Sequence, residues 1–458
     1  MAEEYQAPPP RTSKRPRHDQ PAPLLPDDVI VEQILTRVPA AAAARRAVRA
    51  AGAQQPEIAF FARRPAAAGS SATGFYSCKL KVTSQQEASA AACELVTVSG
   101  LREGDLVLSG TRPCHGLTLL YLPSTSEYHV CNLSTGEHVA LPPCPWAKSE
   151  IPDGPYMLSS TGIGFDVAAG EHKVVRPYKD WTRQERCEVY GLRSGGWRPC
   201  AGQVPPHAAK GLDGRPLVFL DGCFYWHINT LGNFDGPEAD FFSTPEPILS
   251  FAVDTEQFGW VPQPEERSGY SFLLAELDGF LCAVVDLRLT VKRYELWTLP
   301  AGSGSGALPP SWSLRCSISL AGLPPLIRDR MVRPFRMIPL ASSFGGKILL
   351  ATSWHEVFTY DPESNSFDWV FSVQEFMDAP REPHLLLNIA LHEECITSVR
   401  HRPLADGDAG QLKMKIGKST VARRQTPAHQ RQNDFHITPQ LVQMILGIAT
   451  EQYNNMHD

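Results

Sequence analysis

The sequence predicts a mainly β protein with a few short helices near its amino end, and two observations carry this prediction. Between residues 100 and 400, short apolar runs alternate with Gly, Asp, Asn and Pro, a texture typical of strands joined by turns. Before that region, in residues 24–64, apolar residues recur at spacings of three and four, which is typical of helices.

The composition argues against several classes of protein. The chain has 458 residues, 43% of them hydrophobic and 20% charged, so it has enough apolar residues to build a core. No apolar run is long enough for a membrane helix, and the start lacks the pattern of a secretory signal. The net charge of −6 gives no reason to bind nucleic acid. We therefore expect neither nucleic acid nor a membrane as a partner.

Residues 1–23 are rich in Pro and charge, and we expect a disordered tail. The cluster Lys14-Arg15-Pro16-Arg17 could be a nuclear import signal, but a solvated tail is the interpretation that its composition favours. We expect the protein in the nucleus, the cytoplasm or both. The eleven Cys, an odd number without a Cys-x-x-Cys pair, favour a reducing compartment and small buried thiols.

Residues 24–64 are predicted to form three short helices. Leu25 and Pro26 precede the first, whose apolar face holds Val31, Ile34, Leu35 and Val38 and which ends at Pro39. The second covers Ala40–Ala51 and includes Val48, and a third opens at Pro56-Glu57-Ile58. A unit of about 40 residues is too small to be stable alone, so we expect it to rest on a partner or on the next domain.

Residues 65–99 are predicted to be a linker with the first strands, and residues 100–400 a β domain with two recurring turns. One turn is a pair ending in Gly between apolar runs, as at Asp221-Gly222 and Asp278-Gly279. The other follows an apolar strand with Asp or Asn, as at Asn132 and Asp361. They recur with a period somewhat over 50 residues, which predicts five or six blades of a kelch-type β-propeller.

Residues 401–458 are predicted to be a basic, poorly ordered tail without strands that carries a short helix over Thr438–Tyr453. Motifs for phosphate, dinucleotide, zinc or acyl-transfer chemistry are missing from the sequence. We therefore expect no catalytic residue, no metal and no cofactor. An enzyme on a propeller scaffold would need metal ligands clustered at one end of its axis.

The segment Leu25–Pro39 resembles the opening of a plant F-box. The β region resembles the F-box-associated domain that follows it in many plant F-box proteins, through words such as Leu220-Asp221-Gly222-Cys223-Phe224-Tyr225-Trp226 and Tyr294-Glu295-Leu296-Trp297. The resemblance covers residues 25–64 and 100–400. It implies a non-catalytic subunit of a ubiquitin ligase, which docks on a Skp-type adaptor, and through it on cullin, and presents a protein substrate.

By this resemblance, the adaptor-binding residues are Leu25, Pro26, Val31, Ile34, Leu35, Val38, Pro39 and Val48. The second half of the helical unit departs from the family pattern, because Arg49 and Gly52 stand where Cys and Trp are usual. Losing a buried Trp removes about 3–5 kcal/mol of packing or binding. An alternative therefore stays open, namely a propeller interaction protein whose degenerate F-box no longer reaches the adaptor.

Overall fold

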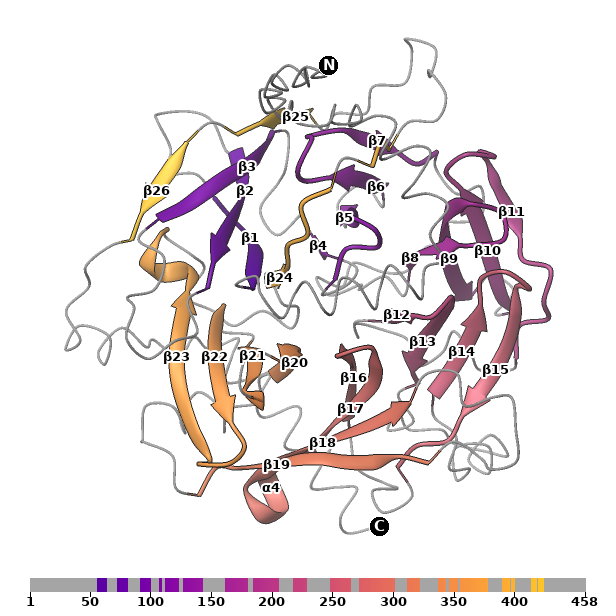
Figure 1. Ribbon diagram of the computed structural model, residues 1–458. Coiled ribbons are helices and arrows are strands. Elements are labelled where there is room, and N and C mark those ends of the chain that lie inside the picture. Colours follow the sequence, from indigo (N-terminus) through magenta and orange to yellow (C-terminus); the bar gives the residue numbers. More distant parts are fainter. Residues whose placement is uncertain are drawn as a thin grey trace, which may run out of the picture. The chain divides into compact units, whose positions relative to one another are not determined.

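The computed structural model describes the chain in segments, which are 56–63, 72–80, 91–99, 107–108, 112–122, 127–142, 161–179, 184–205, 217–228, 248–264, 272–300, 311–321, 337–342, 346–352, 355–377, 389–395, 397–399, 413–417 and 419–423. Nearly all regular structure in these segments is antiparallel β-sheet. The strands form six sheets that are arranged around a common centre (Figure 1). The described part of the chain is thus a six-bladed β-propeller.

Five of the blades are built from four consecutive strands each, with the first strand innermost. Blade 2 contains β4 (Val107–Leu108), β5 (Leu117–Leu122), β6 (Glu127–Asn132) and β7 (His138–Ala140). Blade 3 contains β8 (Gly162–Asp166), β9 (Glu171–Lys179), β10 (Glu185–Gly191) and β11 (Trp197–Pro199). Blade 4 contains β12 (Val218–Leu220), β13 (Cys223–His227), β14 (Ile248–Ala252) and β15 (Gln257–Val261).

Blade 5 contains β16 (Phe272–Leu277), β17 (Phe280–Leu287), β18 (Arg293–Pro300) and β19 (Ser313–Ser319), with the four-residue helix α4 (Arg288–Val291) between β17 and β18. Blade 6 contains β20 (Met337–Ser342), β21 (Ile348–Thr352), β22 (Glu356–Asp361) and β23 (Ser366–Ser372), followed by a 3-10 turn, η5 (Val373–Glu375). No described helix is long and apolar enough to cross a bilayer.

Blade 1 joins the two ends of the domain. Its strands β1 (Glu57–Arg63), β2 (Ala72–Lys79) and β3 (Ala91–Ser99) come from the amino side, and β24 (Ile389–Leu391), β25 (Lys413–Ile416) and β26 (Thr420–Ala422) come from the carboxyl side. β24 is innermost and pairs with β1, whereas β25 and β26 pair with the outer strand β3. Strand pairing between distant segments therefore closes the ring.

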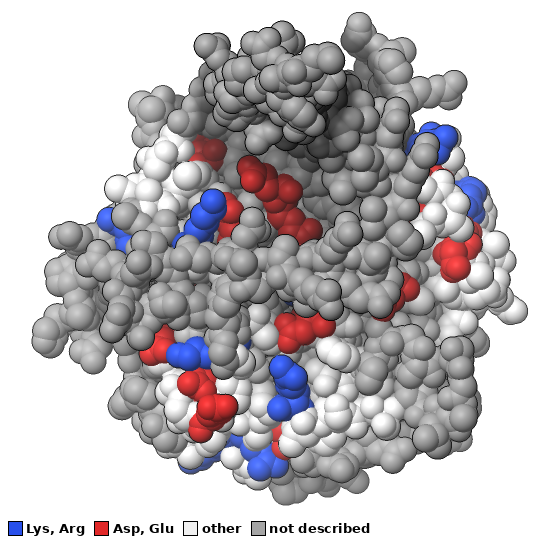
Figure 2. Space-filling view, in the orientation of Figure 1, with Lys and Arg blue, Asp and Glu red and all other residues white. Residues whose placement is uncertain are grey.

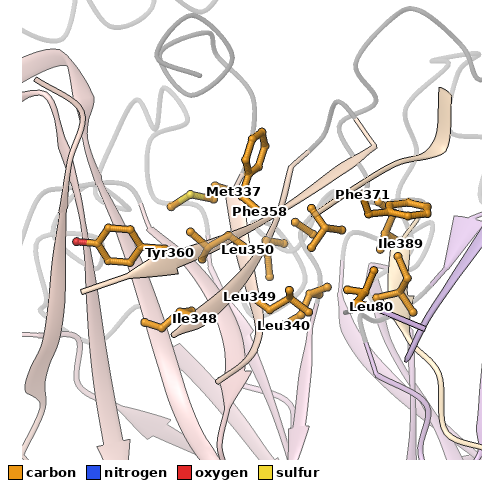
Figure 3. Packing of buried hydrophobic residues seen from close by; sticks show 14 of the residues in the cluster. Leu80, Met337, Leu340, Ile348, Leu349, Leu350, Phe358, Tyr360, Phe371 and Ile389 are labelled. Atoms are coloured by element: carbon orange, nitrogen blue, oxygen red, sulfur yellow. The ribbon is translucent and has the colours of Figure 1, made fainter. Parts of the chain in front are cut away.

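Apolar clusters fill every junction between neighbouring blades. Four separate clusters lie between blades 1 and 2, blades 2 and 3, blades 3 and 4, and blades 4 and 5. One large cluster fills the two remaining junctions, between blades 5 and 6 and between blades 6 and 1. In this large cluster Phe371 of β23 lies beside Ile389 of β24 (Figure 3), and its ring centroid is 5.1 Å from that of Phe60 in β1. Each fully buried side chain of this size contributes about 2 kcal/mol, so the junctions hold the ring together.

The repeat and both predicted turns are confirmed. The innermost strands begin at residues 107, 162, 218, 272, 337 and 389, so the repeat varies between 52 and 65 residues. Asp221 and Gly222 have φ of 47° and 78°, as a primed two-residue hairpin requires. The Asn132 side chain accepts hydrogen bonds from the backbone N–H groups of Ser134 and Thr135, which closes the other turn.

Two expectations are wrong. The third helix, expected from Pro56, is strand β1, and its Ile58, Ala59 and Phe60 are all buried. A strand covered on both sides is a continuous apolar run, and such a run cannot be distinguished from a buried helix by periodicity. The tail after residue 400, expected to lack strands, contributes β25 and β26. The helices expected over 24–55 and Thr438–Tyr453 lie outside the described residues.

Candidate functional site: the connector face of the propeller

The two faces of the propeller carry different ends of the strands. On one face, the turn face, short turns join the first strand of a blade to the second, as at 166–171, 221–222 and 278–279. On the opposite face, the connector face, the second strand of a blade ends and the third begins, as β5 and β6 do in blade 2 and β9 and β10 do in blade 3. The connector face is the candidate site, because aromatic and cationic side chains from neighbouring blades meet there at the ends of these strands.

Among the described residues of this face, an arginine and three tyrosines lie together, and we call them the Tyr–Arg cluster. The Arg176 guanidinium carbon lies 5.8 Å from the ring centroid of Tyr128 and 5.2 Å from that of Tyr178. Tyr121 stacks on Tyr128 with ring centroids 4.8 Å apart. Contacts of this kind between a cation and aromatic faces hold the guanidinium in place while leaving its N–H donors available.

Strand geometry explains how these residues meet. Arg176 and Tyr178 are alternate residues near the end of β9, so both side chains leave the same side of blade 3. Tyr121 lies near the end of β5 and Tyr128 near the start of β6, directly opposite each other on the side of blade 2 that packs on blade 3. Thr161, immediately before β8, donates a hydrogen bond of 3.0 Å to the Tyr128 hydroxyl. The cluster therefore bridges blades 2 and 3.

The charge around Arg176 is only partly balanced by the protein itself. Glu188 lies directly opposite Arg176 in the sheet, but its Oε1 accepts a hydrogen bond of 3.1 Å from the Tyr178 hydroxyl. Among the residues that the structure describes, no carboxylate forms an ion pair with Arg176. Arg176 and Tyr178 are both half-buried. Half-buried Tyr and Arg are the residue types that dominate binding energy at protein interfaces.

A second charged group lies on the turn-face side, since Arg112 is in the β4–β5 connection and Glu276 precedes the turn at 278–279. Arg112, before β5, donates from Nε to Glu276 Oε2 of blade 5 at 2.8 Å. Burial raises the pKa of Glu393, which follows β24, and the Glu276 carboxylate adds to the rise while Arg112 opposes it. Acidic side chains border the hollow near the middle of the face seen in Figure 2. The described residues contain no cluster of three or more metal-ligating side chains.

A buried ionic network fixes blade 3 against blade 4. Lys173 Nζ in β9 lies 2.7 Å from Asp166 Oδ2 and 3.1 Å from Glu256 Oε1, and all three residues are buried. Arg198 also pairs with Glu256, whose Oε2 accepts a hydrogen bond from the Ala201 N–H at 3.0 Å. Burial alone would raise the pKa of Glu256, but these donors outweigh it and hold that pKa at about 2.

The residues proposed from the sequence and the residues found in the structure belong to different parts of the chain. Leu25, Pro26, Val31, Ile34, Leu35, Val38, Pro39 and Val48 all lie outside the described residues. The Tyr–Arg cluster was missed, because its members come from three strands and no linear motif joins them. An Arg two residues before a Tyr at the end of a predicted strand is the only signal that the sequence offered.

The family of F-box associated beta propeller domains matches residues 70–378, which is more than half of the chain. The Arabidopsis thaliana F-box protein At5g49610 is 24% identical over 279 residues, which cover 57% of this chain and 67% of that protein.

Solved structures give a more distant likeness. A chain of the nidogen/laminin complex has 15% identity and a TM-score of 0.39, with coverage of 74% of this chain and 99% of that one. YCF48 bound to D1 peptide has 12% identity and a TM-score of 0.33, with coverage of 70% and 82%. With six blades and the sequence match over 70–378, the chain belongs to the family with an F-box associated beta propeller domain, as the resemblance implied.

Proposed function

We propose that this protein is the substrate-recognition subunit of a Skp-cullin-F-box ubiquitin ligase. Its F-box-like segment, which precedes strand β1, docks on a Skp-type adaptor, and its propeller binds a protein substrate that other subunits ubiquitinate. The observation that supports this proposal is the order of two parts in one chain, where the F-box-like residues Leu25–Pro39 precede an F-box associated propeller. The protein raises the local concentration of the substrate and performs no chemistry of its own.

In this proposal, the connector face of the propeller receives the substrate, and the Tyr–Arg cluster contributes binding energy. The cluster combines rigid aromatic rings with a guanidinium that no described carboxylate neutralises. Such a site favours a substrate segment that carries a carboxylate or a phosphate, because Arg binds either group with two parallel hydrogen bonds.

Adaptor binding by the full-length protein tests the first half of the proposal. Ile34→Asp or Leu35→Asp would place a charge in the predicted apolar interface, and we expect binding to a purified Skp-type adaptor to weaken at least about tenfold. Gln33→Asp is the matched control, since residue 33 lies on the other side of the predicted helix and its variant should bind like the wild type.

Two results would contradict this arrangement. Equal binding by all three variants would show that the helix face is wrongly assigned. Failure of the wild-type protein to bind the adaptor would favour the alternative, a propeller interaction module whose degenerate F-box has lost its partner. Arg49 and Gly52, which replace the usual Cys and Trp, would then be the first positions to examine by reversion.

A further inference from the structure

Two cysteines face each other across neighbouring strands at the junction of blades 3 and 4. Glu188 pairs with Pro199 between β10 and β11, and the ladder continues by one step, because the Cys200 N–H donates to the Cys187 carbonyl at 3.0 Å. Residues that are directly opposite in an antiparallel pair have side chains on the same face of the sheet. Their Cα atoms are about 5.5 Å apart in a hydrogen-bonded pair, within the range that a disulfide requires.

The two thiols are close enough to affect each other's pKa, and they differ in accessibility. Both residues are unbridged: the Cys187 Sγ lies 3.9 Å from the Glu188 carbonyl oxygen, and the Cys200 Sγ donates to the Gly202 carbonyl oxygen at 3.1 Å. Cys187 is buried in the apolar core between blades 3 and 4, whereas Cys200 is half-buried at the edge of that core. A reagent from solvent therefore meets Cys200 before Cys187.

The neighbouring Cys187 favours the thiolate form at Cys200. The Cys187 thiol lowers the pKa of Cys200 in spite of burial, and burial raises the pKa of Cys187 itself. Arg198, two residues earlier on the same face of β11, adds a positive charge that acts on Cys200, although Glu256 opposes it. Cys200 is thus the more reactive thiol of the pair.

We propose that Cys187 and Cys200 form a peroxide-sensitive thiol pair, in which Cys200 reacts first and Cys187 resolves it to a disulfide. In the first step, the Cys200 thiolate attacks one oxygen of hydrogen peroxide, so that an S–O bond forms, the O–O bond breaks and hydroxide leaves. In the second step, the Cys187 sulfur attacks Cys200, an S–S bond forms, and the departing hydroxide takes the Cys187 proton as water. Two thiols are oxidised and one peroxide is reduced.

The disulfide would stiffen the contact between blades 3 and 4. Cys200 is followed by Ala201, whose N–H is bonded to Glu256, and by Gly202, where an added Cβ would overlap the Glu256 carbonyl oxygen. Fastening Cys200 to β10 therefore restrains the segment that carries Glu256 of blade 4. We expect the oxidised protein to unfold at a temperature several degrees higher than the reduced one, and reduction to reverse the shift.

The test is peroxide treatment of the full-length protein, followed by mass spectrometry without reduction. Trypsin cuts after Arg186 and Arg193, so residues 187–193 and 194–210 become separate peptides that only a disulfide joins. We expect this linked pair in the wild type and a mass loss of two hydrogen atoms. In Cys187→Ser, a dimedone probe should instead label a sulfenic acid at Cys200.

Matched controls decide the outcome. Cys93 is exposed, so its labelling reports that peroxide was active, and Cys93→Ser should form the 187–200 link normally. Cys282 and Cys316 lie in one blade with strand β18 between them and should stay unlinked. The proposal fails if Cys93 is oxidised while the linked peptides are missing. It also fails if dimedone labels Cys187 in Cys200→Ser as readily as it labels Cys200 in Cys187→Ser.

Discussion

At the scale of single residues, buried charged side chains connect neighbouring blades. Lys173 lies between the buried carboxylates of Asp166 and Glu256, and it also donates a hydrogen bond of 3.0 Å to the Val253 carbonyl of blade 4. A buried cation of this kind is tolerated only when its donors are satisfied, and here all of the contacts reach groups of blade 3 or blade 4. The network specifies how these two blades meet.

Replacing Lys173 tests this role. Lys173→Met keeps a side chain of similar length but leaves Asp166 buried beside Glu256 without the shared cation, and we expect the free energy of unfolding to fall by about 3 kcal/mol. The matched control is Lys347→Met, because Lys347 Nζ lies 3.5 Å from the exposed Asp368 and such a pair contributes at most about 1 kcal/mol. Urea denaturation of both variants measures the difference, and equal losses would refute the role.

The depressed pKa of Glu256 predicts how stability depends on pH. Since its folded-state pKa of about 2 lies below the usual 4.5, the stabilisation is complete above pH 4.5 and is lost as the pH falls toward 2. We expect the Glu256→Gln variant to show a shallower loss of stability over this range, with Asp166 supplying the remainder, because its pKa is also lowered. Denaturation curves at a series of pH values check this, and identical slopes would contradict it.

At the scale of secondary-structure elements, the carboxyl-terminal strands complete the first blade and also hold the second. After β24, the chain crosses the turns of blade 2, where Asn132 Nδ2 donates to the carbonyls of Cys395 and Thr397 at 2.9 and 2.8 Å. Glu137 accepts hydrogen bonds from Ser398 and from the Val399 N–H, both at 2.9 Å. The chain then returns to blade 1 as β25, so one segment binds two blades.

Two isoleucines in the carboxyl-terminal strands allow the contribution of ring closure to stability to be distinguished from that of an exposed position. Ile389 of β24 is fully buried, whereas Ile416 of β25 is 61% exposed. Ile389→Asp would bury a charge in the innermost strand of blade 1, and we expect a loss of about 3 kcal/mol or more in unfolding free energy. Ile416→Asp should change it by about 0.5 kcal/mol or less. Thermal unfolding distinguishes these outcomes, and a mild effect at Ile389 would mean that β24 is dispensable.

The elements differ in how well the sequence predicts them. Hairpins such as Asp221-Gly222 and Asp278-Gly279 are predictable, because their backbone needs positive φ and the flanking runs are apolar. Strand β1 was not predictable from the sequence, since burial of both its faces removes the alternation of apolar and polar residues that marks a strand. Lys413-Met414-Lys415-Ile416 does alternate, but a short charged edge strand gives a weak signal.

At the scale of the whole molecule, the proposed function assigns two binding tasks to two parts of the chain. The F-box-like segment would bind the adaptor and the connector face of the propeller would bind the substrate. A substitution in one part should therefore abolish one binding activity and leave the other intact. The third blade offers a matched pair of arginines for this test. Arg176 belongs to the Tyr–Arg cluster, and Arg193 lies exposed in the β10–β11 turn on the opposite face.

We expect Arg176→Ala combined with Tyr178→Ala to lose the substrate proteins that the wild type labels in proximity labelling, while adaptor binding is retained. Ile34→Asp should show the opposite pattern, and Arg193→Ala should behave like the wild type in both assays. A substrate set that is unchanged in the double variant but lost with Arg193→Ala would place recognition on the turn face instead.

The sequence by itself determined the class of this protein, the two kinds of turn and the length of the repeat. These depend on local properties, namely the alternation of apolar runs and the backbone preferences of Gly, Asp and Asn. Only the tertiary structure decided the number of blades, the closure by β24, the Tyr–Arg cluster and the facing of Cys187 and Cys200. Each of these arises from contacts between residues that are distant in the chain, or from the register of two strands, and one-dimensional spacing does not encode either.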